Sequence, residues 1–103
     1  METPTRINLA EAKDLLEKNQ DVKIIDVRTK AEYEQQHLPR AEHIAMEDIV
    51  ASGIPYSKET RVLITCNHGL KKSDASAQSL GERGYSNVYI LDGGIKAWFS
   101  EEK

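Results

Sequence analysis

The sequence contains only one cysteine, one tryptophan and one phenylalanine among its 103 residues, and it has no long apolar run. A single thiol cannot form a disulfide bond within the chain. Because no apolar run approaches about 20 residues, the sequence predicts no membrane-spanning helix. Residues 1–6 also lack the basic-then-apolar pattern of a secretion signal. Since a free thiol survives best in a reducing compartment, we expect a cytoplasmic protein.

Neither sign of charge is in large excess, because 14 basic residues face 17 acidic ones and the net charge is −3. A chain without a global basic field is not expected to recruit nucleic acid or an anionic membrane. The three histidines, His37, His43 and His68, do not share metal-ligand spacing, and Cys66 with His68 alone makes a poor zinc site. The sequence therefore predicts no metal site and no cofactor.

Short β-branched segments alternate with capped, amphipathic segments along the whole chain. Strands are expected at 21–27, 61–65 and 87–91, with weaker candidates at 6–7 and 41–46. Helices are expected after Asn8, after Thr29 to about residue 36, at 46–52, at 73–83 and after 92–94. Asn8 with Glu11 and Thr29 with Glu32 have the spacing of capping boxes. This alternation predicts a parallel α/β sheet with its ligand site beyond the carboxyl ends of the strands.

Cys66 comes directly after the expected strand 61–65 and opens the stretch "CNHGLKKS". The thiolate is the reactive form of cysteine, and an ordinary thiol is mostly protonated at neutral pH. Loop amides ahead of a helix, the positive end of that helix's dipole, and Lys71 and Lys72 all favour the thiolate. Gly69 allows a tight loop that directs its amides inward. A cysteine after an apolar strand is more often a small buried hydrophobe, but this combination favours a reactive thiol.

Four segments, in order along the chain, carry a family resemblance. "TCNHGLKKS" (65–73) resembles the active-site loop of the rhodanese family of sulfurtransferases, and "IDVRTKAEY" (25–33) resembles that family's Asp-Val-Arg stretch. "QHLPRAEHI" (36–44) and "GYSNVYILDGGIKAW" (84–98) resemble its next and closing segments. The resemblance implies a single rhodanese domain over residues 5–101. It also implies an α/β, rhodanese-like fold with a central parallel five-stranded sheet and helices on both faces.

The same resemblance implies a thiosulfate sulfurtransferase (rhodanese). Such an enzyme takes a sulfane sulfur onto a cysteine as a persulfide and passes it to a thiophilic acceptor. By residue match Cys66 would be the catalytic cysteine, and the substrate-binding cradle would be Asn67, His68, Gly69, Leu70 and Lys71. The implied partners are a small-molecule sulfur donor such as thiosulfate and a thiol or cyanide acceptor, or a protein sulfur acceptor.

Two residues depart from the family pattern. Lys71 stands where the family often has arginine, so the loop ends in a point charge and not in a bidentate fork. We expect Lys71 to face the bound anion and Lys72, about 100° further round the helix, to face water. Arg40 stands where the family has a small glycine, and it would add charge or bulk if that segment borders the site.

Two other functions fit the same pattern. Phosphatases of related fold have a loop one residue longer that ends in arginine; Lys72 has that spacing, but lysine supports phosphoryl transfer poorly. A non-catalytic persulfide carrier or partner-binding module would also fit Cys66. Outside the loop, we expect Asp26 and Arg28 to have a structural or pocket-rim role, with Arg28 able to pair with Glu32. We expect residues 92–94 to form a turn that requires glycine backbone conformations.

Overall fold

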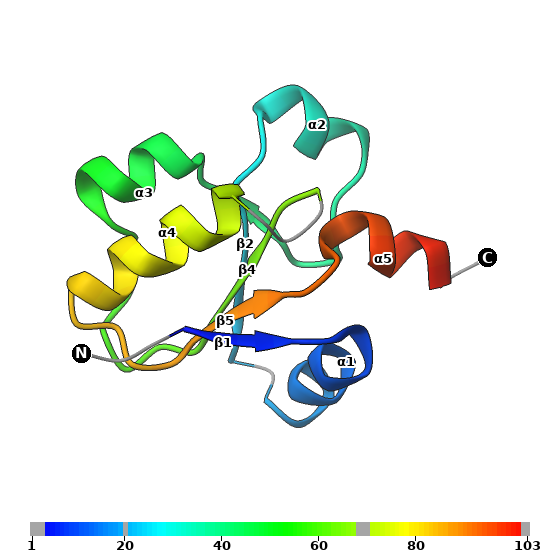
Figure 1. The fold of residues 1–103 in the computed structure, drawn as a ribbon, viewed down its shortest axis with the longest axis horizontal. Coiled ribbons are helices and arrows are strands. Elements are labelled where there is room, and N and C mark those ends of the chain that lie inside the picture. The colour runs from blue at the N-terminus through cyan, green and yellow to red at the C-terminus, as the bar shows by residue number, and fades with distance from the viewer. Residues whose placement is uncertain (1–3, 20, 68–70, 102–103) are drawn as a thin grey trace.

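The computed structural model describes residues 4–19, 21–67 and 71–101 of the chain. Strands and helices alternate throughout this part (Figure 1). The strands are β1 (Thr5–Ile7), β2 (Lys23–Asp26), β3 (Glu42–His43), β4 (Val62–Thr65) and β5 (Val88–Leu91). The helices are α1 (Leu9–Lys18), α2 (Lys30–Gln35), α3 (Met46–Ser52), α4 (Lys71–Glu82) and α5 (Gly94–Glu101).

The five strands form one parallel sheet in the order β1-β5-β4-β2-β3. β4 lies at the centre, with Asp26 of β2 in register with Thr65 on one side and Ile90 of β5 in register with Ile64 on the other. Because neighbouring parallel strands end at the same edge, the segments that follow β2, β4 and β5 meet there. The predicted α/β architecture is confirmed.

The core has one hydrophobic cluster on each face of the sheet. Ile25 and Ile64 belong to the cluster under α3 and α4, whereas Ile24 and Leu63 belong to the cluster under α1 and α5. Figure 1 shows these two helix pairs on opposite sides of the sheet. The central strand β4 is buried along its whole length, and its neighbours β2 and β5 are buried over most of theirs, which explains why these three strands are mainly apolar runs. The edge strands β1 and β3 carry polar residues that are exposed or only partly buried.

The predicted helix starts are confirmed where capping residues mark them. The Asn8 side chain accepts a hydrogen bond from the Glu11 amide at 2.8 Å, and the Glu11 carboxylate accepts one from the Asn8 amide at 2.8 Å. Thr29 and Glu32 form the second capping box. The prediction was less exact for α4, which begins at Lys71, two residues ahead of the expected start. No helix in the described part of the chain is long and apolar enough to cross a membrane.

Arg40 lies in a turn where its backbone is left-handed. The Ala41 amide donates a hydrogen bond to the Leu38 carbonyl at 3.1 Å, which closes a turn over Pro39 and Arg40. Arg40 has φ of 68°, and among the described residues no other non-glycine has a positive φ. A type II turn favours proline at its second position and glycine at its third, because the third residue needs positive φ. A glycine at position 40 would therefore adopt this backbone without strain.

We predict that Arg40→Gly is more stable than Arg40→Ala by about 1 kcal/mol, because only glycine adopts positive φ without a steric penalty. The alanine variant controls for whatever the arginine side chain contributes, since both variants remove it. The free energy of unfolding of each variant in urea tests this. Equal stabilities of the glycine and alanine variants would contradict it.

Candidate active site

Cys66 follows the last residue of β4, at the edge where the loops after β2 and β5 also lie. Its relative exposure is 5%, and it belongs to the cluster under α3 and α4. Of the predicted cradle, Asn67 and Lys71 are described, whereas His68, Gly69 and Leu70 lie outside the described residues. Because α4 begins at Lys71, the positive end of a 12-residue helix follows the loop.

The two lysines at the start of α4 have the opposite burial from that expected. Lys71 is exposed and Lys72 is partly buried, so the prediction that Lys72 faces water more than Lys71 was wrong. The phase of the helix explains this. Ser73 and Ala77 are fully buried against the sheet, and at about 100° per residue Lys72 lies at the flank of that face while Lys71 lies nearly opposite. Both charges remain in the first turn, beside the loop.

The segment that begins at Cys66 and leads into α4 is called the cysteine loop below. Its first two residues form backbone hydrogen bonds with the N-terminus of α5. The Ile95 amide donates to the Cys66 carbonyl at 2.8 Å, and the Lys96 amide donates to the Asn67 carbonyl at 3.1 Å. The first amides of a helix have no hydrogen-bond acceptor within the helix. In α5 the carbonyls of Cys66 and Asn67 accept hydrogen bonds from two of these amides. A Cβ atom on Gly94 would lie 2.2 Å from the Cys66 carbonyl oxygen. The close approach therefore requires glycine at this position.

Gly93 and Gly94 both have positive φ, of 80° and 62°. The expectation that residues 92–94 form a turn dependent on glycine is therefore confirmed. The contact of Gly94 with Cys66 was not expected from the sequence. The position of both segments after neighbouring strands, β4 and β5, is the feature that could have indicated it.

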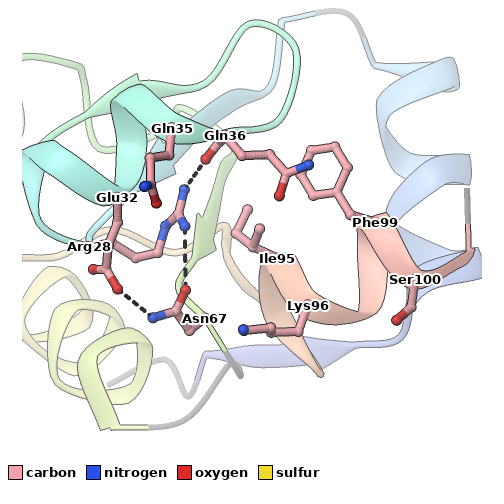
Figure 2. Close-up of a pocket in the computed structure, with 9 residues that line it drawn as sticks. All are labelled: Arg28, Glu32, Gln35, Gln36, Asn67, Ile95, Lys96, Phe99 and Ser100. Carbon is pink, nitrogen blue, oxygen red and sulfur yellow. Dashed lines mark hydrogen bonds between the residues drawn. The ribbon is translucent and has the colours of Figure 1, made fainter.

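A buried ion pair lies on the other side of the loop. Asp26 is fully buried and Arg28 is 5% exposed. The Arg28 Nη2 donates to the Asp26 carboxylate at 2.7 Å and Nε donates to both of its oxygens at 3.0 and 3.1 Å. Arg28 also donates to the Gln36 carbonyl and, through Nη1 at 3.3 Å, to Oδ1 of Asn67 (Figure 2). Arg28 therefore connects β2, the end of α2 and the cysteine loop. Its ion-pair partner is Asp26, in keeping with the structural role expected of these two residues, whereas the spacing in the sequence had also allowed a pair with Glu32.

Glu32 binds the amide nitrogen of the Asn67 side chain, whose oxygen is bound by Arg28. Asn67 Nδ2 donates to Oε2 of Glu32 at 2.8 Å, while Oε1 accepts from the Thr29 amide at 3.1 Å. The hydrogen bond from Asn67, with smaller contributions from Thr29 and the charge of Arg28, lowers the pKa of Glu32 to about 2 against the opposing effect of desolvation. Glu32 is therefore charged at neutral pH. Sequence reasoning identified Glu32 as a capping residue and as a residue able to pair with Arg28, and did not connect it with Asn67.

A pocket of about 520 Å³ lies between α2 and α5, with Asn67 in its wall (Figure 2). Its other lining residues include Arg28, Glu32 and Gln36 on one side and Lys96 and Phe99 on the other. Arg40 is exposed and does not line this pocket. The sequence did not indicate the pocket, because α2 and α5 are separated by most of the chain.

The described histidines bind backbone carbonyls. His43 Nε2 lies 2.7 Å from the Arg28 carbonyl oxygen and His37 Nδ1 lies 2.7 Å from that of Tyr33. Within the described ranges, no three His, Cys, Asp or Glu side chains come together as metal ligands would.

Residues 8–101 match the family described as Rhodanese-like domain. The chain belongs to this family. The thiosulfate sulfurtransferase GlpE of Coxiella burnetii is 38% identical over 93 residues, which cover 90% of this chain and 85% of that protein. The thiosulfate sulfurtransferase GlpE of Pseudoalteromonas translucida is 34% identical over 92 residues, covering 89% and 86%. The resemblance found in the sequence is confirmed.

Solved structures of rhodanese-like proteins have the same fold. A rhodanese-like domain protein from Staphylococcus aureus superposes with a TM-score of 0.81 at 29% identity, covering 91% of this chain and 90% of that one. The human single-domain sulfurtransferase TSTD1 gives a TM-score of 0.85 at 21% identity, covering 98% and 99%. The second likeness concerns the fold alone. The rhodanese-like fold class is confirmed.

We predict that Gly93→Ala and Gly94→Ala both destabilise the protein, by about 1–2 kcal/mol for the left-handed backbone alone. They should differ at the cysteine. A methyl group on Gly93 would meet the Cβ atom of Ala97 at 2.7 Å, whereas one on Gly94 would meet the Cys66 backbone. Only Gly94→Ala should therefore change the rate at which iodoacetamide alkylates Cys66 in the folded protein. Identical alkylation rates in both variants would contradict this.

We predict that Glu32 makes stability depend on pH. Because its pKa falls from 4.5 to about 2 on folding, it stabilises the native state above about pH 4.5, and this contribution is lost as the pH falls towards 2. The difference in free energy of unfolding between wild type and Glu32→Gln should therefore shrink between pH 6 and pH 3. Glu34→Gln, on the exposed face of the same helix, is the matched control. A difference that is constant with pH would contradict the prediction.

Proposed function

We propose that this protein is a thiosulfate sulfurtransferase in which Cys66 carries the transferred sulfur as a persulfide. The observation that carries the proposal is the position of Cys66, between the end of the central strand β4 and the N-terminus of α4. Membership of the rhodanese-like family and the names of the GlpE relatives support the reaction class and the donor.

The first half-reaction loads the cysteine. The Cys66 thiolate attacks the outer sulfur of thiosulfate, a new S–S bond forms, and the S–S bond of thiosulfate breaks with its electron pair leaving on sulfite. The atoms and charges balance without any further oxidant or reductant. In the second half-reaction an acceptor such as cyanide or a thiol removes the outer sulfur and regenerates the thiolate. This is nucleophilic catalysis divided into two displacements.

The electrostatics around the loop support an anionic donor. The proposed cradle consists of Asn67, His68, Gly69, Leu70 and Lys71, and it leads into the positive end of α4. Lys71 and Lys72, both in the first turn of α4, add two positive charges next to this loop. The two carboxylates connected to the loop are both engaged, Asp26 by Arg28 and Glu32 by Asn67 and Thr29.

The phosphatase alternative has weaker support. A phosphatase of related fold needs arginine at the position of Lys72, and lysine has no planar fork with which to hold a phosphoryl group in two bonds. A persulfide carrier would load in the same way but would not turn over. The two half-reactions therefore have to be measured separately.

We predict that thiosulfate adds one sulfur atom to the wild-type protein, as read by intact mass spectrometry, and that cyanide or dithiothreitol removes it. Cys66→Ser should show neither loading nor turnover while keeping the wild-type melting temperature, because only the thiolate can form the persulfide. Sulfite release over many cycles distinguishes an enzyme from a carrier, and an aryl phosphate tests the phosphatase alternative. Turnover retained in Cys66→Ser would overturn the mechanism.

A further inference from the structure

We infer that the pocket between α2 and α5 binds the acceptor of the second half-reaction, and that Lys96 selects small thiols carrying a carboxylate. The inference rests on the proposed function. It concerns the part of the site that the sulfur donor does not fill. The structural basis is a pocket lined by Asn67 of the cysteine loop and by one cation, Lys96, that has no ion-pair partner among the described residues.

The pocket suits an organic molecule better than thiosulfate. Its volume of about 520 Å³ is in the usual range for small-molecule sites, whereas thiosulfate is a small inorganic anion. Ile95 and Phe99 supply apolar surface from α5, and Gln35 and Gln36 supply amide groups from the α2 side. Such a mixture of apolar and polar lining fits the carbon chain and polar end of a small thiol.

Lys96 is fixed relative to the cysteine loop through its own backbone. Its amide donates to the Asn67 carbonyl at 3.1 Å, so the base of its side chain stays beside the residue that follows Cys66. Figure 2 shows the Lys96 side chain leaving α5 with its amine on the side of Asn67. An acceptor whose anionic end binds this amine would therefore lie against Asn67, the residue that directly follows Cys66.

The other charged groups of the pocket are already engaged. Arg28 donates to Asp26, Gln36 and Asn67, and both oxygens of Glu32 accept hydrogen bonds. In the described part of the chain the Lys96 amine has no ion pair or hydrogen bond with another side chain. Its charge is thus available to a ligand, although solvent screens it because Lys96 is exposed.

In the transfer step, the acceptor thiolate attacks the outer sulfur of the Cys66 persulfide. A new S–S bond forms on the acceptor, and the bond between that sulfur and Cys66 Sγ breaks with its electron pair leaving on the cysteine thiolate. The acceptor becomes a persulfide and no other redox partner is required. Lys96 takes no part in the bond changes; it positions the acceptor and neutralises its carboxylate.

The test compares three acceptors of similar size and different charge: 3-mercaptopropionate, 2-mercaptoethanol and cysteamine. Lys96→Met should lower kcat/KM for 3-mercaptopropionate about three- to fivefold more than for 2-mercaptoethanol, the size expected of one partly screened charge pair. Lys96→Glu should shift the preference towards cysteamine. Using the ratio between acceptors removes differences in the reactivity of the thiols themselves. Added salt should reduce the effect.

Lys58→Met is the matched control, because Lys58 is exposed and precedes β4 at the opposite edge of the sheet; all its ratios should equal those of wild type. If Lys96→Met changes all three acceptors equally, or if it raises only the KM for thiosulfate, the acceptor site is overturned. Failure of the wild-type protein to load sulfur from thiosulfate would instead overturn the proposed function. Loading and turnover with cyanide therefore separate the two failures.

Discussion

Two backbone hydrogen bonds, from the start of α5 to the carbonyls of Cys66 and Asn67, determine how the site is built. They form because β4 and β5 are neighbours in a parallel sheet, so the segments that follow them leave from the same edge. Gly94 allows the contact, since any Cβ atom there would overlap the Cys66 carbonyl. The same contact sets where Lys96 and Phe99 stand, and so it defines one wall of the pocket.

The opposite wall depends on the buried pair of Asp26 and Arg28. Burying two charges costs free energy unless both are well hydrogen-bonded, and here the carboxylate accepts from the Arg28 side chain and from its backbone amide. The remaining donors of Arg28 reach Gln36 and Asn67. The Asn67 side chain is thus held from two sides, by Arg28 and by Glu32, while its backbone is held by α5. Asn67, the residue after Cys66, therefore has little freedom to move.

Local chemistry in the sequence was enough to predict the strands, both capping boxes and the glycine turn, because each depends on residues a few positions apart. Contacts between distant segments were not predictable in this way. Asn67 and Glu32 are 35 positions apart and meet only because β2 and β4 are neighbours. The exposure of Lys71 and Lys72 depended on the phase of α4, which is set by the residues that pack on the sheet. The left-handed backbone of Arg40 was not predicted from the sequence, because arginine, unlike glycine, does not indicate a positive φ.

The lysines at the end of the cysteine loop also affect how specificity is divided between the sulfur donor and the acceptor in the proposed reaction. Arginine would hold an oxyanion through two parallel hydrogen bonds, whereas lysine offers a point charge with no fixed direction. In the reaction that we propose, donor recognition would therefore depend more on the dipole of α4 and on point charges than on a side-chain fork. Such a cradle accepts small anions with little regard to their shape. In the same proposal, discrimination among larger partners would be made by the pocket between α2 and α5, whose lining combines apolar surface with the charge of Lys96.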